Sequence, residues 1–451
     1  DDAPGARVMS ARRILRALPL VVALAGLAGT AAADWLSPDA TYRDAQAQLR
    51  FATRDTAGHG DDPARLDTLA TALLRLGRLN DARKLFTRVL DAAPNDAAAN
   101  AALGKLALFA DDLPRAESLL TRAGEVGESR ADLYATLLRR GSWSAAAALA
   151  TELNDEGRVP LLESLSEQGP GAPTGTPGDV WLERIWPAPL VRVKLNGTLV
   201  WMLVDTGTPG LLLDPVTVRQ NGVRALAGQR LADWDGSRVA VRNALAPRLE
   251  LAGITWTNVP AGVVSLRKLS LHVNPQSVSV VGVIGLSLLR DHDVTFDFKS
   301  RRLRFAALGS TPKGIGARVP FELWGEGGLT VWGSLGGGRR MAMLLATGLP
   351  EAGVGAPDVV FDELGLKPGG MSRLVKGAGS WLQGRPWAQV GVPGVTLGAV
   401  AFDAQPGWTG AMDPLELWRH GVRRDALLGP GILRGRRMTI DWMRRELVFE
   451  D

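Results

Sequence analysis

Two stretches of the chain, far apart in the sequence, repeat one pattern. Residues 201–210 read WMLVDTGTPG and residues 342–351 read AMLLATGLPE, so each stretch places Thr-Gly and then Pro behind an apolar run. The first copy has Asp205 before its Thr-Gly, whereas the second copy has Ala346 at the same place. The pattern therefore predicts two similar halves, of which only one carries a carboxylate.

The repetition continues beyond these two stretches with its register unchanged. The segment VVGVIGLSLLRDHDVTFDFKSRRLRF matches the later segment DALLGPGILRGRRMTIDWMRRELVF. The interval from Gly285 to Asp297 is the same as the interval from Gly429 to Asp441. Such equal spacing indicates that a whole structural unit, and not only a short motif, is present twice.

The duplicated region has the texture of β-structure. Segments such as LVRVKLNG, RLELAGITWTNV and VTFDFKSRRLRF alternate apolar and polar residues, and Gly, Asn-Gly and Asp-Gly turns separate them. Alternation with period two is typical of half-buried strands joined by tight turns. We therefore predict an all-β region made of a first lobe at 181–310 and a second lobe at 311–451.

Over residues of about 185 to 451 the chain resembles the aspartic proteases of the pepsin and retropepsin kind. The family pattern is apolar-apolar-Asp-Thr-Gly, a flap hairpin, and an apolar-apolar-Gly segment that closes a loop beside the catalytic turn. The first copy supplies Asp205, Thr206 and Gly207, and later Ile284 and Gly285. The resemblance implies that the first three form the catalytic turn and that the last two border the substrate.

The chemistry of such a site needs two carboxylates. Close together they cannot both ionise, so they share a proton, and one acts as general base on water while the other donates to the carbonyl oxygen. Ala346, Thr347 and Gly348 then form a degenerate second site, and the resemblance makes Thr347 the hydrogen-bond partner of Thr206. The alternative for Asp205 is a turn-capping residue at the end of a strand.

The flap is expected from LADWDGSRVAV, with Asp235 and Gly236 as its turn. Trp234 is an aromatic candidate for closing over a substrate, and the alternative is that it packs on the hairpin itself. In the second copy, VKGAGSWLQGRPW at 375–387 is the corresponding candidate for a shorter cover.

The N-terminal part contains a helical repeat. Small and apolar residues recur with a period of 34 between residues 63 and 128, which resembles the tetratricopeptide repeat. We predict a helical repeat domain over 34–163 and a Gly/Pro-rich linker over 164–180. The alternative is an unrelated bundle of helical hairpins. Repeats of this kind imply a protein partner.

The first residues read as a targeting segment. Basic residues after Met9 precede an apolar stretch of about a dozen residues that ends in alanines, which is typical of a secretory signal peptide. We predict a signal peptide over 1–33, cleaved near Ala33, with 1–8 as an upstream extension. The alternative is a short membrane anchor, although the apolar run is shorter than a membrane span needs. The predicted location is the bacterial periplasm or the cell exterior, with no stable membrane span after cleavage.

Composition narrows the chemistry. The 52 Lys and Arg residues are interleaved with 47 Asp and Glu residues, which argues against a nucleic-acid partner. The chain has no cysteine, and its four histidines show no metal-ligand spacing, so we expect neither a metal nor another cofactor.

Three functions remain open at this point. The first is an aspartic endopeptidase that acts on peptides or unfolded proteins, with a homodimer supplying a second Asp205. The second is a pseudoprotease with weak or no activity that binds peptides or proteins by strand addition. The third is a structural protein of the cell envelope in which both parts are scaffolds.

Overall fold

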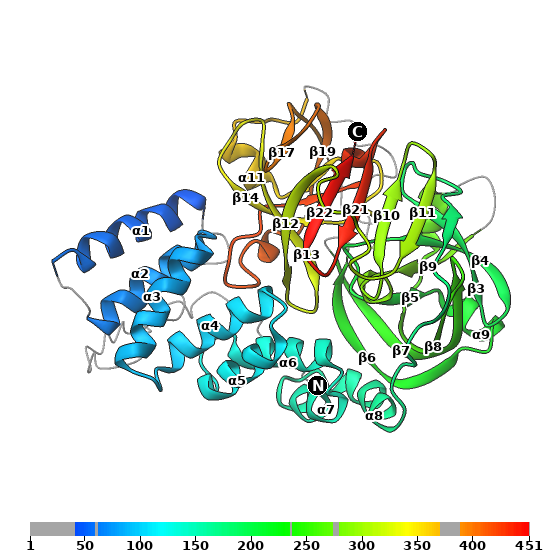
Figure 1. Cartoon of the computed structure of the whole chain (residues 1–451), viewed down its shortest axis with the longest axis horizontal. Coiled ribbons are helices and arrows are strands. Elements are labelled where there is room, and N and C mark those ends of the chain that lie inside the picture. The colour runs from blue at the N-terminus through cyan, green and yellow to red at the C-terminus, as the bar shows by residue number, and fades with distance from the viewer. Residues whose placement is uncertain (1–40, 59–61, 235–236, 274–278, 370–387, 451) are drawn as a thin grey trace, which may run out of the picture.

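The structure is a computed structural model that describes residues 41–58, 62–234, 237–273, 279–369 and 388–450. Helices form the N-terminal part and β-strands dominate the remainder (Figure 1). This order confirms the predicted fold class of helical repeats followed by a two-lobed β region. The predicted signal peptide over 1–33 lies outside the described residues.

The helical part consists of antiparallel helices in sequence order: α1 (Tyr42–Thr56), α2 (Pro63–Arg75), α3 (Leu79–Ala92), α4 (Ala97–Phe109), α5 (Leu113–Ala123), α6 (Ser129–Arg140), α7 (Trp143–Glu152) and α8 (Val159–Glu167). Aspartates start three of them, because the side chains of Asp62, Asp96 and Asp112 each accept a hydrogen bond from a backbone N–H of the first turn. No helix in the described part of the chain is long and apolar enough to cross a membrane.

Small residues allow these helices to approach one another. Ala82 and Ala116, which occupy equivalent positions of successive repeats, are both fully buried. At Gly104, an added Cβ would lie 2.7 Å from the Cγ atom of Leu120, so α4 and α5 could not pack this closely around a larger residue. The period seen in the sequence is therefore the period of helix contacts.

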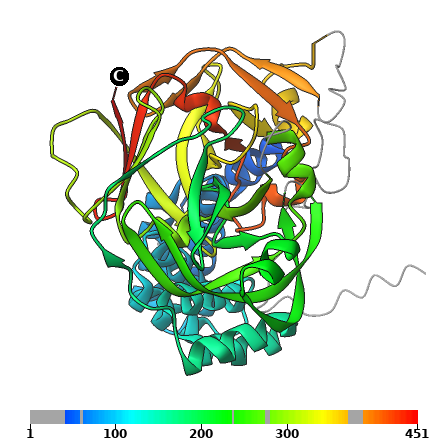
Figure 2. The same cartoon turned by 90° about the vertical axis from the view of Figure 1, so that its right-hand side faces the viewer.

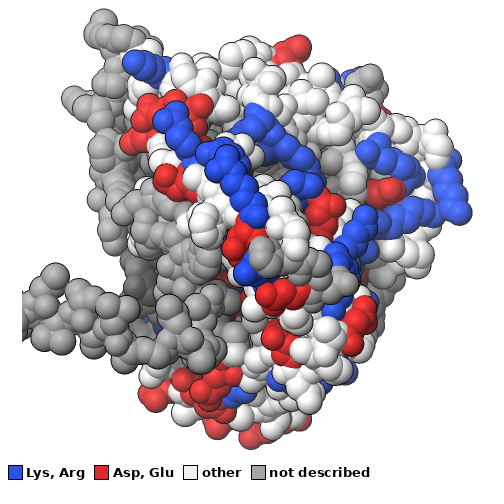
Figure 3. Space-filling view, turned by 90° about the vertical axis from the view of Figure 1, so that its left-hand side faces the viewer, with Lys and Arg blue, Asp and Glu red and all other residues white. Residues whose placement is uncertain are grey.

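Acidic and basic side chains alternate on the outer face of the repeats. In the view onto this end of the molecule, Lys and Arg lie among Asp and Glu (Figure 3). One example is the ion pair between Arg78 and Asp81, whose closest nitrogen and oxygen are 2.6 Å apart. Both side chains of this pair are largely exposed, so such pairs contribute little to stability.

The predicted linker at 164–180 is not a free connection. Helix α8 extends to Glu167, and the residues that follow add two short strands, β1 (Thr174–Gly175) and β2 (Asp179–Trp181). Strand β1 pairs with β8 of the first lobe and β2 pairs with β11. Backbone hydrogen bonding can hold a Gly- and Pro-rich segment against a sheet edge even though its composition shows no strand periodicity.

The first lobe is a curved sheet with the strand order β1-β8-β5-β9-β4-β3-β7-β6. Its elements are β3 (Leu190–Leu195), β4 (Thr198–Val204), β5 (Leu211–Leu213), α9 (Pro215–Gln220), β6 (Arg224–Trp234), β7 (Ser237–Leu251), β8 (Ile254–Val263), α10 (Arg267–Val273), β9 (Val280–Ile284), the 3-10 turn η2 (Leu286–Leu288), β10 (Asp293–Asp297) and β11 (Arg302–Ala306). Strands β6 and β7 form the long hairpin that the sequence predicts as a flap.

The second lobe repeats this arrangement. Its elements are β12 (Ala317–Trp324), β13 (Gly328–Leu335), β14 (Met341–Leu345), β15 (Val354–Ala356), α11 (Asp358–Glu363), β16 (Gln389–Val392), β17 (Val395–Leu397), β18 (Val400–Phe402), β19 (Gln405–Thr409), η3 (Pro414–Leu417), β20 (Ala426–Leu428), η4 (Pro430–Leu433), β21 (Arg437–Asp441) and β22 (Glu446–Glu450). In each lobe one central strand lies parallel to a later one: β4 beside β9, and β14 beside β20.

A shared sheet joins the two lobes around an approximate two-fold axis. Strand β10 of the first lobe pairs antiparallel with β21 of the second. Thr295 pairs with Thr439, its own counterpart in the repeat, and their hydroxyl oxygens are 2.8 Å apart. Because equivalent residues pair with each other, the axis passes between them.

The helical part docks on both lobes through the ends of its helices. Teal helices lie at the base of the molecule beneath the green strands of the first lobe (Figure 2). On the second lobe, the ring of Phe109 stacks on that of Trp324 with their centroids 4.8 Å apart. On the first lobe, the Asn243 side chain donates to the carbonyl oxygen of Gly157 at 2.6 Å. The helices and the two lobes therefore enclose a common space.

Candidate active site

Two matching turns meet where the lobes touch. Strand β4 ends at Val204 and Asp205 follows it, whereas β14 ends at Leu345 and Ala346 follows it. The backbone N–H of Asp205 donates to Ile284 O, and the N–H of Ala346 donates to Leu428 O. Each turn is thus held by the strand parallel to its own, and the two turns face each other as the duplication predicts.

The threonines of the two turns exchange hydrogen bonds. Thr206 N donates to the Thr347 hydroxyl at 3.0 Å, and Thr347 N donates to the Thr206 hydroxyl at 3.2 Å. Each hydroxyl also donates to a backbone carbonyl of the opposite lobe, at Leu345 and Val204. Both threonines are buried, so this reciprocal network ties the two lobes together at the centre of the site.

Asp205 is the carboxylate at this junction. Its Oδ1 atom accepts hydrogen bonds from Gly207 N at 2.9 Å and from Gly348 N at 2.8 Å. Its Oδ2 atom accepts from the hydroxyl of Thr208 at 2.6 Å. Asp205 as a residue is 8% exposed and lines a cavity. Three hydrogen bonds fix the orientation of the carboxylate.

The glycines of both turns are required by close approach. A Cβ on Gly348 would lie 2.5 Å from the Cγ atom of Asp205, and a Cβ on Gly207 would lie 2.8 Å from the Cβ atom of Ala346. Such contacts are shorter than real Cβ atoms make. A larger residue than glycine at either position would therefore displace the facing turn.

The turn of the second lobe differs from the first at two positions. It has Ala346 where the first has Asp205, and Leu349 where the first has Thr208. Ala346 and Leu349 pack with Trp408 and Ala411 in a buried apolar cluster. The half of the site opposite Asp205 is thus a hydrophobic wall.

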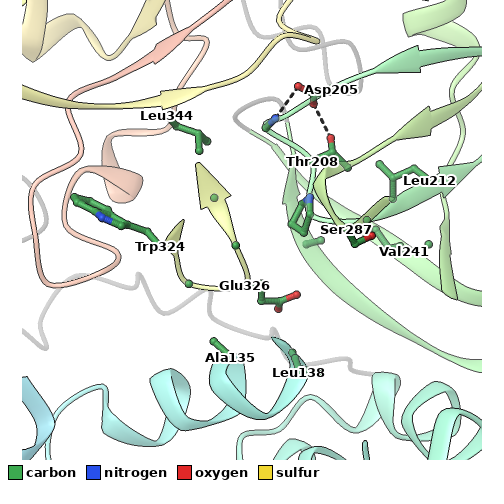
Figure 4. A pocket seen from close by; sticks show the side chains of 18 of the residues that line it. Ala135, Leu138, Asp205, Thr208, Leu212, Val241, Ser287, Trp324, Glu326 and Leu344 are labelled. Atoms are coloured by element: carbon green, nitrogen blue, oxygen red, sulfur yellow. Dashed lines mark hydrogen bonds between the residues drawn. The ribbon is translucent and has the colours of Figure 1, made fainter. Parts of the chain in front are cut away.

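A cavity of about 840 Å³ lies against this junction. In the close-up view, Asp205 and Thr208 lie at one side of it and Leu212, Val241 and Leu344 border it (Figure 4). Its size is that of a small-molecule or short-peptide site, and its lining combines apolar side chains with many charged ones.

Ile284 and Gly285, which were expected to border the substrate, lie behind the turn instead. Ile284 is 1% exposed and belongs to the hydrophobic core. A Cβ on Gly285 would lie 2.2 Å from the carbonyl oxygen of Gly210. Both residues support the Asp205 turn, and the neighbouring Val283 and Ser287 border the cavity in their place.

The flap is described up to its tip. Strand β6 ends at Trp234, whose backbone pairs with Ser237, but Asp235, Gly236 and the side chain of Trp234 lie outside the described residues. Within the described part of the hairpin, the cavity is bordered by Arg230, Leu231, Ala232, Val241 and Asn243. The second predicted cover, at 375–387, also lies outside the described residues.

Other acidic residues near the duplicated motifs, Asp297, Asp441 and Glu351, do not join the site. Asp297 Oδ1 accepts from Ser300 N at 2.8 Å, and Asp441 Oδ1 accepts from Arg444 N at 3.0 Å, as expected for residues that cap strand turns. Glu351 is absent from the described residues that line the cavity. Burial raises its pKa. Among the described residues that line the cavity near the turns, Asp205 is the carboxylate in position for chemistry.

The sequence did not reveal that the helical part also borders the cavity. Ala135 and Leu138 of α6 lie across the cavity from Asp205 (Figure 4). Arg158 and Glu326 face the same space and form a bidentate ion pair with nitrogen–oxygen distances of 2.8 and 3.0 Å. No motif marks these residues, because repeat periodicity describes contacts between helices and not contacts with a distant domain.

Burial shifts the pKa values of several ionisable groups that line the cavity. Burial raises the pKa of Asp132 to about 6, although nearby Lys105 opposes the shift. Burial would also raise the pKa of Glu326, but the charge and hydrogen bonds of Arg158 lower it to about 2. Burial, with Arg424 and Lys105 close by, holds the pKa of His420 well below its usual range. The cavity lining therefore includes paired charged side chains and an imidazole that favours its neutral form.

Comparison with known families agrees with this geometry. Residues 191–288 match the family model described as aspartyl protease, and residues 73–141 match the model described as tetratricopeptide repeat. No curated protein matches the chain. The chain thus contains a segment similar to aspartyl proteases, which includes the Asp205 turn and the flap, preceded by a segment similar to tetratricopeptide repeats.

Proposed function

We propose that this chain is a peptide-binding protein derived from an aspartic protease of the pepsin or retropepsin kind, with weak or no peptidase activity of its own. The observation that carries the proposal is the pair of replacements opposite Asp205. Where a second acid and its hydroxyl partner would lie, Ala346 and Leu349 form an apolar wall. A single carboxylate can orient water but lacks the acid partner that protonates the substrate carbonyl.

The binding part of the proposal rests on three features of the site. The flap hairpin, the cavity of about 840 Å³ and the hydrogen-bonded Asp205 are features that hold an extended peptide. These features argue against the third function, a purely structural envelope protein.

Residual peptidase activity is the second candidate, and the geometry of Asp205 favours it. The carboxylate still accepts three hydrogen bonds and still borders the cavity. A homodimer that brings in a second Asp205 does not fit this arrangement, because Thr347 of the same chain already takes the partner position of Thr206. Any hydrolysis would therefore have to use Asp205 alone.

Secretion and the role of the repeats complete the proposal. The basic and apolar residues before Ala33 support export to the periplasm or the cell exterior. The match to tetratricopeptide repeats supports a protein partner, and the charged outer face of the helices is the surface left for it.

The test is to measure binding and cleavage on the same protein. Purified chain, and its Asp205→Asn variant, are titrated with pepstatin and with a pool of short peptides, and cleavage of those peptides is followed from acid to neutral pH. We expect binding of both ligands by the wild type and slow or no cleavage. Absence of binding at every pH would reject the proposal, and rapid cleavage abolished by Asp205→Asn would favour the active peptidase.

A further inference from the structure

The helical repeats supply one side of the cavity that Asp205 borders. Residues of α6 and α8 line the same space as the Asp205 turn and the flap, among them Ala131, Ala135, Leu138 and Leu161. A cleft between two lobes is ordinarily open along its length to a chain that passes through it. Here a third element lies across the mouth, as the position of Ala135 and Leu138 opposite Asp205 makes visible (Figure 4).

The contacts that hold the helices in place are buried on the second lobe. Trp324 and Phe109 stack with each of them 1% exposed. The guanidinium of Arg139 donates to Leu323 O at 3.0 Å, and Lys105 donates to His420 O at 2.9 Å. Separating these surfaces would expose two large aromatic side chains and would break the hydrogen bonds to Leu323 O and His420 O, and both changes are unfavourable.

Contacts with the base of the flap also hold the helical part in place. A Cβ on Gly228, which has a φ of 83°, would lie 2.2 Å from the carbonyl oxygen of Gly157. Asn243 bridges the same two segments, since its amide donates to Gly157 O and, at 2.9 Å, to Ala227 O. The base of the flap and the helical part therefore form one packed unit.

We propose that the helical repeats are a fixed wall of the ligand site, so that the chain binds short peptides and excludes long or folded chains. This inference rests on the proposed peptide binding at Asp205 and specifies its substrate class. The cavity of about 840 Å³ lies within the range of sites for small ligands. The apolar side chains of Leu212, Val241, Leu344 and Leu138 suit a peptide with apolar residues.

Peptide length is the first variable to test. Mixed-sequence peptide pools of about six residues, roughly 20 Å when extended, are compared with pools of about 20 residues for retention on the full chain. We expect the short pool to be enriched and the long pool to be retained at least tenfold less. Equal retention of both pools would overturn the inference while leaving the proposed binding intact.

Two matched tryptophan variants test the wall itself. Ala131→Trp adds bulk to an exposed position that lines the cavity, whereas Ala92→Trp makes the same change at an exposed end of α3 away from it. We expect the first variant to weaken binding of the enriched short peptides by about tenfold or more, as the loss of well-packed contacts does. The second variant should bind them as the wild type does, and equal binding by both variants would contradict a helical wall.

A crosslink separates a fixed wall from a cover that must open. The chain has no cysteine, so Ser164→Cys with Arg224→Cys, a hydrogen-bonded pair that joins α8 to β6 and is not among the described residues lining the cavity, can be joined by a short bifunctional thiol reagent without side reactions. The control is the same pair treated with a monofunctional reagent. We expect crosslinked and control proteins to bind short peptides equally, and loss of binding only after crosslinking would show that the helices must move. If no protein binds peptides of either length, the proposed function fails together with this inference.

Discussion

Asp205 of the first lobe accepts a hydrogen bond from Gly348 N of the second lobe, with 2.8 Å between Oδ1 and N. The lobe that lacks an acid thus helps to orient the acid of the other. The second turn has Ala346 and Leu349 where the first has Asp205 and Thr208, yet both turns contain Thr-Gly. The backbone of the second turn orients Asp205, whereas the side chains of Ala346 and Leu349 do not.

Gly348→Ala tests this task. Its Cβ would lie 2.5 Å from the Cγ atom of Asp205, so the carboxylate or the turn must shift. We expect the free energy of unfolding to fall by about 1–3 kcal/mol, in the range of core overpacking, and peptide binding to weaken. Gly391→Ala is the control, because a Cβ there meets nothing within 4 Å. Chemical denaturation that finds the two variants equally stable would count against the close approach.

Thr347→Val tests the exchange between the turns. The hydroxyl of Thr347 accepts from Thr206 N and donates to Val204 O, so its removal leaves two buried backbone groups without these partners. An unsatisfied buried group costs about 1–3 kcal/mol, and we expect a loss of stability in that range. Thr396→Val, at an exposed strand position, should change stability by no more than about 0.5 kcal/mol. Similar urea midpoints for both variants would be the opposing result.

Glu326→Gln predicts a pH-dependent loss of stability. The folded-state pKa of Glu326 is lowered to about 2 from an ordinary value of 4.5, because Arg158 outweighs burial. The ionised form therefore contributes stability that is fully present above pH 4.5 and is lost as the pH falls toward 2. We expect the variant to be less stable than the wild type at neutral pH and the difference to shrink below pH 4.5.

The control for this measurement is Glu163→Gln, at an exposed position of α8. Thermal unfolding of all three proteins across the acid range should show the pH-dependent difference for Glu326 alone. A difference between Glu326→Gln and the wild type that does not change between neutral pH and pH 2 would mean that the ion pair with Arg158 is not its source.

Much of the architecture could be predicted because it depends on local pattern and on spacing. The equal intervals from Gly285 to Asp297 and from Gly429 to Asp441 reflect equivalent strands, and the repeat period of the N-terminal part reflects helix packing. The meeting of Asp205 and Ala346 also followed from the duplication. Each of these features occurs at least twice along the chain, so the second occurrence supports the interpretation of the first.

The rest could not be predicted because it depends on contacts that occur once. Nothing in the sequence pairs Arg158 with Glu326, which lie in different domains, or brings Phe109 against Trp324. The composition of 164–180 suggested a linker, whereas backbone pairing draws it onto sheet edges. Ile284 was expected at the substrate because it adjoins the motif, but its side chain belongs to the core.

Processing is a separate prediction. Because the apolar stretch before Ala33 is short and is followed by Asp34, we expect a cell that exports the protein to release a chain that begins at or near Asp34. N-terminal sequencing of protein recovered from the periplasm or the medium measures this directly. Recovery of a chain that still begins at Met9, from membranes, would favour the anchor alternative.

The measurement that tests the central claim most directly is restoration of the second acid together with its partner. Ala346→Asp with Leu349→Thr rebuilds the counterpart of Asp205 and Thr208. A pair of carboxylates there would share a proton, and general acid–base assistance is worth about 10²- to 10⁴-fold in rate. Cleavage of a pool of short peptides at acid pH is followed for the wild type, for the double variant, and for the double variant with Asp205→Asn. The account predicts little or no cleavage by the wild type, a gain for the double variant, and loss of that gain with Asp205→Asn. A wild type that cleaves as fast as the double variant would contradict it.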